Sequence, residues 1–306
     1  AMLAYSLTKL MSRIACVQPT CFNDALAYAL GQIGWLSTPK WRRYMAKENV
    51  KECLGVSETE AERIAKESVT RFGRMLIEVL RYPLINQANF RNLVHFEGLE
   101  HLEEAYAEGR GVIMCTAHYG NWEMLGASMA LLGYPILSIT RKQNDGDADR
   151  FINEYRQMVG QHVTYNHGKS SMLSIGRYLK DKHLVGILYD QDSAHTGEHL
   201  ELFGKPARVP DGAAQLARVF KAPIVPLFMH NQPDGTLTAV IHPCFHADPQ
   251  LSREENSHVI MEKLIRIAEE EIRRDPAMWF WVHDRWKDGK RRYRDRKHFS
   301  TPMTGN

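Results

Sequence analysis

His118 and Glu123 are separated by four residues and lie where an apolar run ends and a helical pattern begins. The run 111–117 predicts a strand and residues 121–132 predict a helix, with Gly120 allowing a sharp turn between them. At such a corner the carboxylate can hold one ring nitrogen and leave the other basic. Free N–H groups at the helix start can bind an oxyanion or a phosphate. The spacing therefore permits a general base at this corner, and a loop histidine beside a helix-capping glutamate is the alternative.

Two aspartates, Asp190 and Asp192, follow another apolar run, 184–189. They could bind a metal, pair with an arginine or accept a hydrogen bond from a substrate hydroxyl, and ordinary turn chemistry is the alternative. His195 and His199 have the spacing of some zinc sites. Gly197 between them opposes a helix and no third ligand is evident, so we expect no metal site.

Basic residues occur at three places where an anion could bind. Arg141 ends the apolar run 135–140, and Lys205 and Arg208 belong to the segment 202–210, which we interpret as a tight loop before a helix. Arg285 lies in the tryptophan-rich segment 279–287. Aromatic residues beside cations can bind an anionic membrane, a phosphorylated lipid or nucleic acid, whereas core tryptophans with a solvated tail are the alternative.

The elements that must position these residues alternate in type along the chain. Apolar runs predict strands at 111–117, 135–140, 184–189, 223–229 and 237–241, with helical patterns between them. We therefore expect an α/β fold with a largely parallel sheet flanked by helices, and a helical N-terminal layer. A capping box at Ser57 opens one long helix of that layer. Functional residues should lie at the carboxyl ends of the strands.

The N-terminal segment has an unusual charge pattern. Asp24 is its only formal charge between residues 14 and 39, and basic residues flank it. Pro19 and Asp24 interrupt the apolar sequence, so a continuous membrane span is not expected. We predict that residues 1–45 form a helical segment associated with a membrane surface and that residues 46–306 form one α/β domain. A helical hairpin packed on the protein's own core is the alternative.

Composition excludes several classes of protein. The chain has 39 basic and 36 acidic residues and a net charge of +3, which does not favour nucleic acid as a partner. Its five cysteines contain no C-x2-C pair, which indicates a reducing compartment. The sequence contains no G-x-S-x-G, Walker A or G-x-G-x-x-G motif, so covalent serine hydrolysis, P-loop chemistry and Rossmann redox chemistry lose support.

In this order, the blocks resemble the late acyltransferases of lipid A biosynthesis and their relatives that acylate phosphatidylinositol mannosides. The resemblance extends over roughly residues 40 to 290. It is carried by five blocks in one order: His118 to Glu123, Thr140-Arg141, Asp190-Gln191-Asp192, 203–207 and 281–287.

The resemblance implies transfer of a fatty acyl chain from acyl carrier protein or coenzyme A to a sugar-linked hydroxyl of a lipid A precursor. It implies no cofactor, and it places the protein at the cytoplasmic face of the bacterial inner membrane. His118 would be the base and Glu123 its orienting partner. The substrate-binding residues would be Arg141, Asp190, Asp192, Lys205, Arg208 and Arg285. A phosphatidylinositol mannoside or a lysophospholipid is an alternative acceptor. A metal-dependent hydrolase and a non-enzymatic membrane or nucleic-acid binder are alternative classes.

Overall fold

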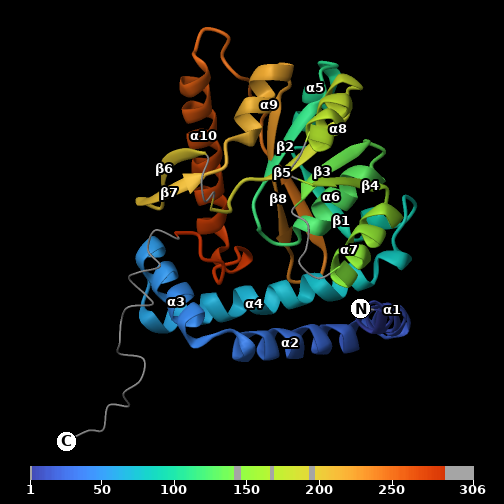
Figure 1. Cartoon of the computed structure of the whole chain (residues 1–306). Helices are drawn as coiled ribbons and strands as arrows, with labels where there is room; N and C mark the ends of the chain where they lie inside the picture. The colour runs from blue at the N-terminus through green and yellow to red at the C-terminus, as the bar shows by residue number, and fades with distance from the viewer. Residues whose placement is uncertain (1, 141–145, 166–168, 193–196, 287–306) are drawn as a thin grey trace, which may run out of the picture.

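The computed structural model describes residues 2–140, 146–165, 169–192 and 197–286. Its architecture is a layer of N-terminal helices beneath an α/β domain (Figure 1). This agrees with the fold class expected from the alternating sequence pattern.

The N-terminal layer consists of α1 (Met2–Val17), α2 (Thr20–Ser37), α3 (Lys40–Leu54) and α4 (Glu58–Leu80). The predicted start of α4 is confirmed, because the Ser57 side chain accepts a hydrogen bond from the backbone N–H of Glu60. Helices α2 and α4 pack very closely at Gly31, where a Cβ would lie 2.4 Å from the Cα of Thr70. Within the described residues, no helix combines the length and apolar character needed to cross a bilayer.

The central sheet is mostly parallel. Its strand order is β1-β9-β8-β2-β5-β3-β4, and among these neighbours only the β8–β9 pair is antiparallel within the described residues. The strands are β1 (Val94–Glu97), β2 (Val112–Thr116), β3 (Ile136–Thr140), β4 (Gln161–Tyr165), β5 (Leu184–Leu188), β8 (Ile224–Asn231) and β9 (Leu237–Ile241). The apolar runs predicted five of these strands. They did not predict β1 and β4, which form the two edges of the sheet and are largely polar.

Helices cover both faces of the sheet and bury two separate apolar clusters. One cluster includes residues of α8 (Lys169–Lys180), α9 (Gly212–Phe220) and α10 (Arg253–Arg274). The other includes residues of α5 (Leu99–Ala107), α6 (Trp122–Leu131) and α7 (Gly146–Met158). The described residues also form the short 3₁₀ helices η1 (Tyr82–Leu84), η2 (Phe90–Asn92) and η3 (Pro276–Met278).

The segment 202–210, which we interpreted as a tight loop, is in fact part of a hairpin, so the prediction of a loop is wrong. Strands β6 (Glu198–Leu202) and β7 (Lys205–Val209) pair antiparallel. Phe203 and Gly204 join them with φ values of 54° and 70°, the left-handed conformation that two-residue hairpin turns require. Apolar side chains at alternate positions of both strands are buried, and this burial fixes the hairpin against α10.

Candidate active site

Strand register brings His118 and Asp190 together. Thr116 is paired with Leu188 at the ends of the parallel strands β2 and β5, and each functional residue lies two positions beyond. The Nδ1 atom of His118 lies 2.7 Å from Oδ1 of Asp190, and the backbone N–H of His118 donates to Oδ2 at 3.0 Å. The carboxyl ends of two neighbouring strands thus form an imidazole–carboxylate pair, as the open α/β architecture predicts.

The Asp190 carboxylate is buried and ionised. Burial by itself would raise the pKa of this group, but the charge and hydrogen bonds of His118 and a hydrogen bond from Trp279 outweigh it and hold the pKa well below the usual range. An ionised carboxylate accepts a hydrogen from Nδ1, so the neutral ring carries its lone pair on Nε2. The side-chain nitrogen of Gln191 lies 3.0 Å from that Nε2 atom. The ring is therefore oriented to act as a base through Nε2.

The 278–280 segment clamps the corner that carries His118. Tyr119 forms an antiparallel bridge with Trp279, Gly120 donates to the carbonyl of Met278, and Phe280 donates to the carbonyl of His118. The indole N–H of Trp279 donates to Oδ2 of Asp190 at 2.8 Å. The same segment thus fixes both the backbone of the base and the carboxylate that orients it.

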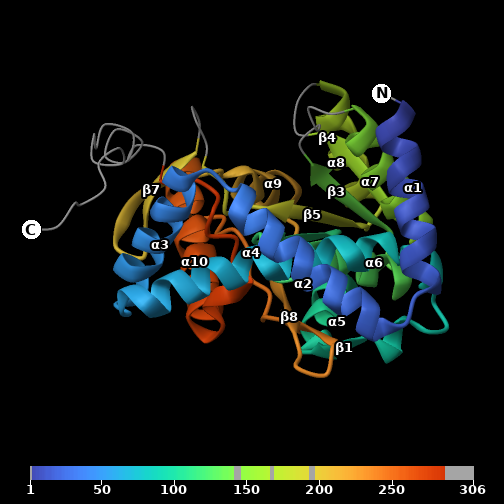
Figure 2. The same ribbon diagram turned by 90° about the horizontal axis from the view of Figure 1, so that it is seen from below.

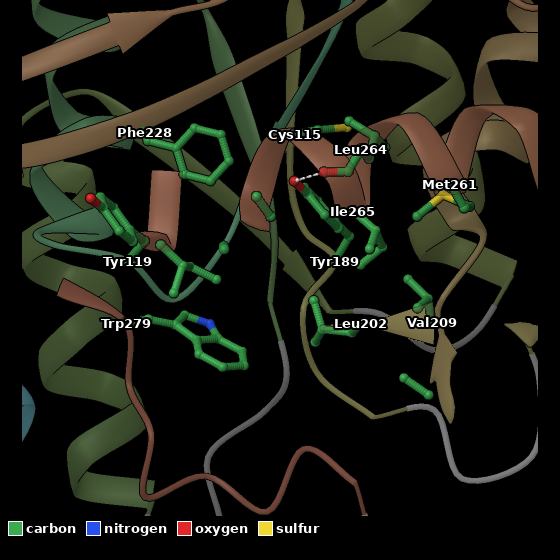
Figure 3. Packing of buried hydrophobic residues seen from close by; sticks show 14 of the residues in the cluster. Cys115, Tyr119, Tyr189, Leu202, Val209, Phe228, Met261, Leu264, Ile265 and Trp279 are labelled. Atoms are coloured by element: carbon green, nitrogen blue, oxygen red, sulfur yellow. Dashed lines mark hydrogen bonds between the residues drawn. The ribbon is translucent and has the colours of Figure 1, made fainter. Parts of the chain in front are cut away.

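Packing beneath the strand ends supports this arrangement. Figure 3 shows Trp279, Tyr119 and Tyr189 among the buried side chains, and the Tyr189 hydroxyl donates to the carbonyl of Leu264 in α10 at 2.9 Å. Tyr189 immediately precedes Asp190, so this bond ties the end of β5 to a helix. The position of Asp190 is therefore set by a well-packed scaffold.

The predicted hydrogen bond between Glu123 and His118 is wrong. Glu123 lies in the first turn of α6 but forms a bidentate pair with Arg156 of α7, at 2.6 and 2.8 Å. Burial would raise the pKa of Glu123, yet Arg156 outweighs this effect and lowers it. The Glu123 charge still lies within electrostatic reach of His118. Asp190, predicted to bind substrate, makes the contact that was assigned to Glu123.

Arg285 lies near this pair and is almost fully buried. One of its nitrogens donates to the carbonyl of Arg208 at 3.1 Å, whereas Nε and Nη2 have no hydrogen-bond partner among the described residues. Burial lowers the pKa of this guanidinium, and the negative charges of Asp190 and Asp192 oppose that shift. Arg285 thus has two buried donors without a described partner, and its charge lies within electrostatic reach of the two aspartates.

The remaining predicted residues do not all converge on His118. Lys205 extends toward the helical layer, where it contacts Asn49 at 2.9 Å and Glu52 at 2.7 Å and lies over the ring of Trp286. Arg208 lies on β7 of the hairpin. Arg141 and His195 lie outside the described residues. In the part of the chain that the structure describes, no three histidine, cysteine, aspartate or glutamate side chains are grouped as metal ligands are.

The sequence did not identify three residues that complete the site. Gln191 stands between the two aspartates and could have been noticed from that position. Trp279 belongs to a segment whose aromatic character was evident, but its indole contact depends on a residue 89 positions away. Arg156 carries no local signal, because it is one of several charged residues on α7.

Replacing Trp279 by phenylalanine tests the clamp. We expect Trp279→Phe to lower the catalytic rate about tenfold, because a hydrogen bond to a charged group contributes about 1.5–3 kcal/mol. Loss of this donor also raises the pKa of Asp190, so the ionised carboxylate should contribute less to the free energy of unfolding near neutral pH than it does in the wild type. Trp281→Phe is the matched control, since the Trp281 indole donates to the carbonyl of Pro276 instead. Equal catalytic rates in Trp279→Phe and Trp281→Phe would contradict the positioning role.

Fold and site together define an α/β protein with a mostly parallel sheet and a carboxylate-paired histidine at the carboxyl ends of its strands. The family model described as bacterial lipid A biosynthesis acyltransferase matches residues 10–288, and the chain belongs to that family. The resemblance inferred from the five sequence blocks is thereby confirmed.

Individual relatives fall into two groups. The chain is 28% identical over 186 residues to a phosphatidylinositol mannoside acyltransferase of Mycobacterium tuberculosis, which covers 59% of this chain and 58% of that protein. It is 26% identical over 262 residues to a lipid A biosynthesis palmitoleoyltransferase of Escherichia coli, covering 84% and 83%. A lipid A biosynthesis acyltransferase of Haemophilus influenzae is 23% identical over 272 residues, covering 86% and 81%. The chain thus spans less than two thirds of the mycobacterial relative but more than four fifths of the other two.

Proposed function

We propose that this protein transfers a fatty acyl chain from an acyl thioester, carried by acyl carrier protein or coenzyme A, to a hydroxyl of a lipid A precursor. The observation that carries this proposal is the buried Asp190 carboxylate on Nδ1 of His118, which leaves Nε2 basic at the strand-end edge. The family and the extent of the match to the lipid A relatives support the choice of acceptor.

The reaction follows from the orientation of the ring. The acceptor hydroxyl gives its proton to Nε2 of His118 while its oxygen attacks the thioester carbonyl. A carbon–oxygen bond forms, the carbon–sulfur bond breaks, and the imidazolium returns the proton to the leaving thiolate. Asp190 stabilises the imidazolium in between. Gln191 occupies the hydrogen-bonding position at Nε2, so the acceptor hydroxyl would replace its amide there.

Arg285 is the described residue best placed to bind negative charge in this reaction. Its buried Nε and Nη2 donors lie within electrostatic reach of Asp190 and Asp192. Planar guanidinium groups bind phosphate and carboxylate oxygens with two parallel hydrogen bonds. We therefore assign Arg285 to an anionic group of the donor or acceptor. Arg141 stays a sequence-based prediction for the same role.

A phosphatidylinositol mannoside is the second candidate acceptor. The Mycobacterium tuberculosis relative named for that activity has the highest percentage identity of the three described above, although it matches a shorter part of the chain. The chemistry would be unchanged, because both acceptors present a hydroxyl on a membrane-borne head group. The two candidates differ in the head group that must fit beside His118.

Product analysis tests the activity and separates the two acceptors. The purified protein is incubated with an acyl thioester and with either a lipid A precursor or a phosphatidylinositol mannoside, and the lipids are examined by mass spectrometry. We expect the lipid A precursor to gain the mass of one acyl chain in ester linkage. If only the mannoside is acylated, the acceptor is a phosphatidylinositol mannoside and not a lipid A precursor. Hydrolysis of the thioester with no acylated lipid would contradict the proposal.

We further propose that α1 and α2 dock on a membrane surface, which would place the protein at the cytoplasmic face of the bacterial inner membrane. Figure 2, seen from below, places both helices at the outside of the N-terminal layer. Their exposed large apolar side chains include Leu7, Leu10, Ile14 and Val17 on α1 and Phe22, Tyr28, Ile33 and Leu36 on α2. Such a face suits a helix that lies in the lipid interface. Helix α3 runs across residue 45, so the predicted domain boundary falls within a helix.

Charge substitutions on α2 test this docking. Ile33→Glu combined with Leu36→Glu should weaken binding to vesicles of phosphatidylethanolamine and phosphatidylglycerol by more than tenfold. Each large apolar side chain contributes about 1.5–3 kcal/mol on burial, so the loss of two such side chains corresponds to more than a tenfold change in affinity. Met172→Glu with Leu173→Glu is the matched control, because these exposed residues lie on α8. Equal losses in the two double variants, measured by vesicle sedimentation, would contradict docking through α2.

A further inference from the structure

Two adjoining cavities lie between α2 and the rest of the protein, and they differ in chemistry. The larger, about 770 Å³ in volume, is bounded by α2, α4 and residues of β8 and β9. The smaller, about 360 Å³, is bounded by α2, α4 and the segment that contains η1 and η2. Asp24, Ala27 and Arg74 line both cavities. His118 and Asp190 line neither cavity, so these spaces are separate from the proposed catalytic pair.

The larger cavity is polar but its charges are balanced. Arg71 is paired with Glu67 and Asp275, and Arg74 with Asp24. Each arginine of this lining thus has a carboxylate nearby, Arg274 with Glu271 at 4.0 Å, so the guanidinium groups are not free to attract an anion. The remaining polar lining consists of Glu97, Arg274 and His230, the hydroxyls of Thr70, Thr238 and Tyr28, and the amides of Asn231 and Gln232. Gln232 donates to the Thr238 hydroxyl, and Gln32 donates to the Thr70 hydroxyl. Closely spaced donors and acceptors of this kind suit a neutral ligand that carries several hydroxyls.

The smaller cavity is mainly apolar. Its lining includes the aliphatic and aromatic side chains Ile77, Leu84, Ile85, Phe90 and Leu93. Asn23 also lines it, and its side-chain N–H groups donate to the carbonyls of Ala15 and Gln18. The Oδ1 atom of Asn23 is buried without a hydrogen-bond partner among the described residues. A buried acceptor without a partner costs about 1–3 kcal/mol, and a ligand with one donor near its apolar part would remove that cost.

The contrast between the cavities identifies the kind of ligand. A molecule that occupies both must have a hydroxyl-rich, uncharged head and a hydrocarbon part, with the Asp24–Arg74 pair at their junction. Tyr28, which lines the larger cavity, also belongs to the exposed apolar face of α2. A lipid could therefore enter from the membrane side of this helix. We propose that the two cavities bind one amphiphile with a neutral sugar-like head group, independently of the reaction at His118.

Titration calorimetry with dodecyl maltoside below its critical micelle concentration tests this site. Ala27→Leu fills the part shared by both cavities and should weaken binding at least tenfold. Gln232→Ala removes one head-group contact and should weaken it roughly fivefold, the effect of one hydrogen bond of about 1 kcal/mol. Ala25→Leu is the matched control, because Ala25 is exposed on the same helix. Dodecylphosphocholine, with the same chain and a charged head, should bind at least tenfold more weakly than the maltoside.

Several outcomes would overturn the site. They are a wild-type titration that does not saturate, equal affinities for the two head groups, or the same affinity in Gln232→Ala and Ala25→Leu. Gln232→Ala decides the result if Ala27→Leu fails to fold, because Gln232 is only partly buried beside the turn between β8 and β9. His118→Ala should bind the maltoside as the wild type does. If His118→Ala loses acyl transfer but still binds the maltoside, the two proposals can be judged separately.

Discussion

His118→Ala should lower kcat for acyl transfer by about 10²–10⁴-fold, the range typical of losing a general base. The reason is that the substitution removes the Nε2 lone pair, which faces the side chain of Gln191 in this structure. KM for either substrate should change much less, because the imidazole acts mainly in the transition state. Steady-state kinetics with a labelled acyl thioester and a lipid A precursor would measure both quantities.

His246→Ala is the matched control for this change. His246 also contacts a carboxylate, Glu108, but the pair is exposed on the surface. We expect this variant to retain wild-type kcat. Retained activity in His118→Ala, or an equal loss in both variants, would contradict the assignment of His118 as the base.

Asp190→Asn should lower kcat on the order of 10³–10⁴-fold while preserving the shape of the site. An asparagine amide can donate to Nδ1, which would place the ring hydrogen on Nε2 and remove the basic lone pair. Circular dichroism should confirm that the variant is folded, and the kinetics should show the loss in kcat. Activity within tenfold of the wild type would show that Asp190 does not set the tautomer.

The pH dependence of stability gives a second reading of Asp190. Its folded-state pKa lies below that of an unfolded aspartate, about 3.9. The charge therefore stabilises the fold at pH values above the unfolded pKa, and this stabilisation is lost as the pH falls through the folded pKa. The difference in free energy of unfolding between wild type and Asp190→Asn should accordingly be constant near neutral pH and shrink in strong acid.

Glu123 gives the contrasting case. Glu123→Gln leaves the buried Arg156 guanidinium without its counter-charge, and breaking a buried pair in this way costs about 3–5 kcal/mol. Replacement of Asp190 should therefore affect catalysis, whereas replacement of Glu123 should affect mainly stability. Asp190 directly holds the base, whereas Glu123 ties the start of α6 to α7.

Much of the fold was predictable because buried strands of a parallel sheet are continuous apolar runs. β2, β3, β5, β8 and β9 all have this property. The edge strands β1 and β4 lack it, because solvent on their outer side permits polar residues such as His162. Gln161 of β4 is buried, but its amide donates to the Ser138 hydroxyl. The β6–β7 hairpin was missed because the Gly-Lys-Pro sequence at 204–206 is typical of a loop. The hairpin depends instead on alternate buried side chains along two short strands.

The sequence by itself determined that His118 lies at a strand-to-helix corner and that Asp190 follows another strand, since both conclusions depend on local patterns. Only the tertiary structure decided which carboxylate holds the imidazole. Glu123 is nearer in sequence, but the first turn of α6 directs it to Arg156, 33 residues away. Asp190 is 72 residues from His118, yet the register of β2 and β5 places the two side by side. Pairing between strands is set by the burial of the whole sheet, so the spacing of two residues in one segment could not reveal it.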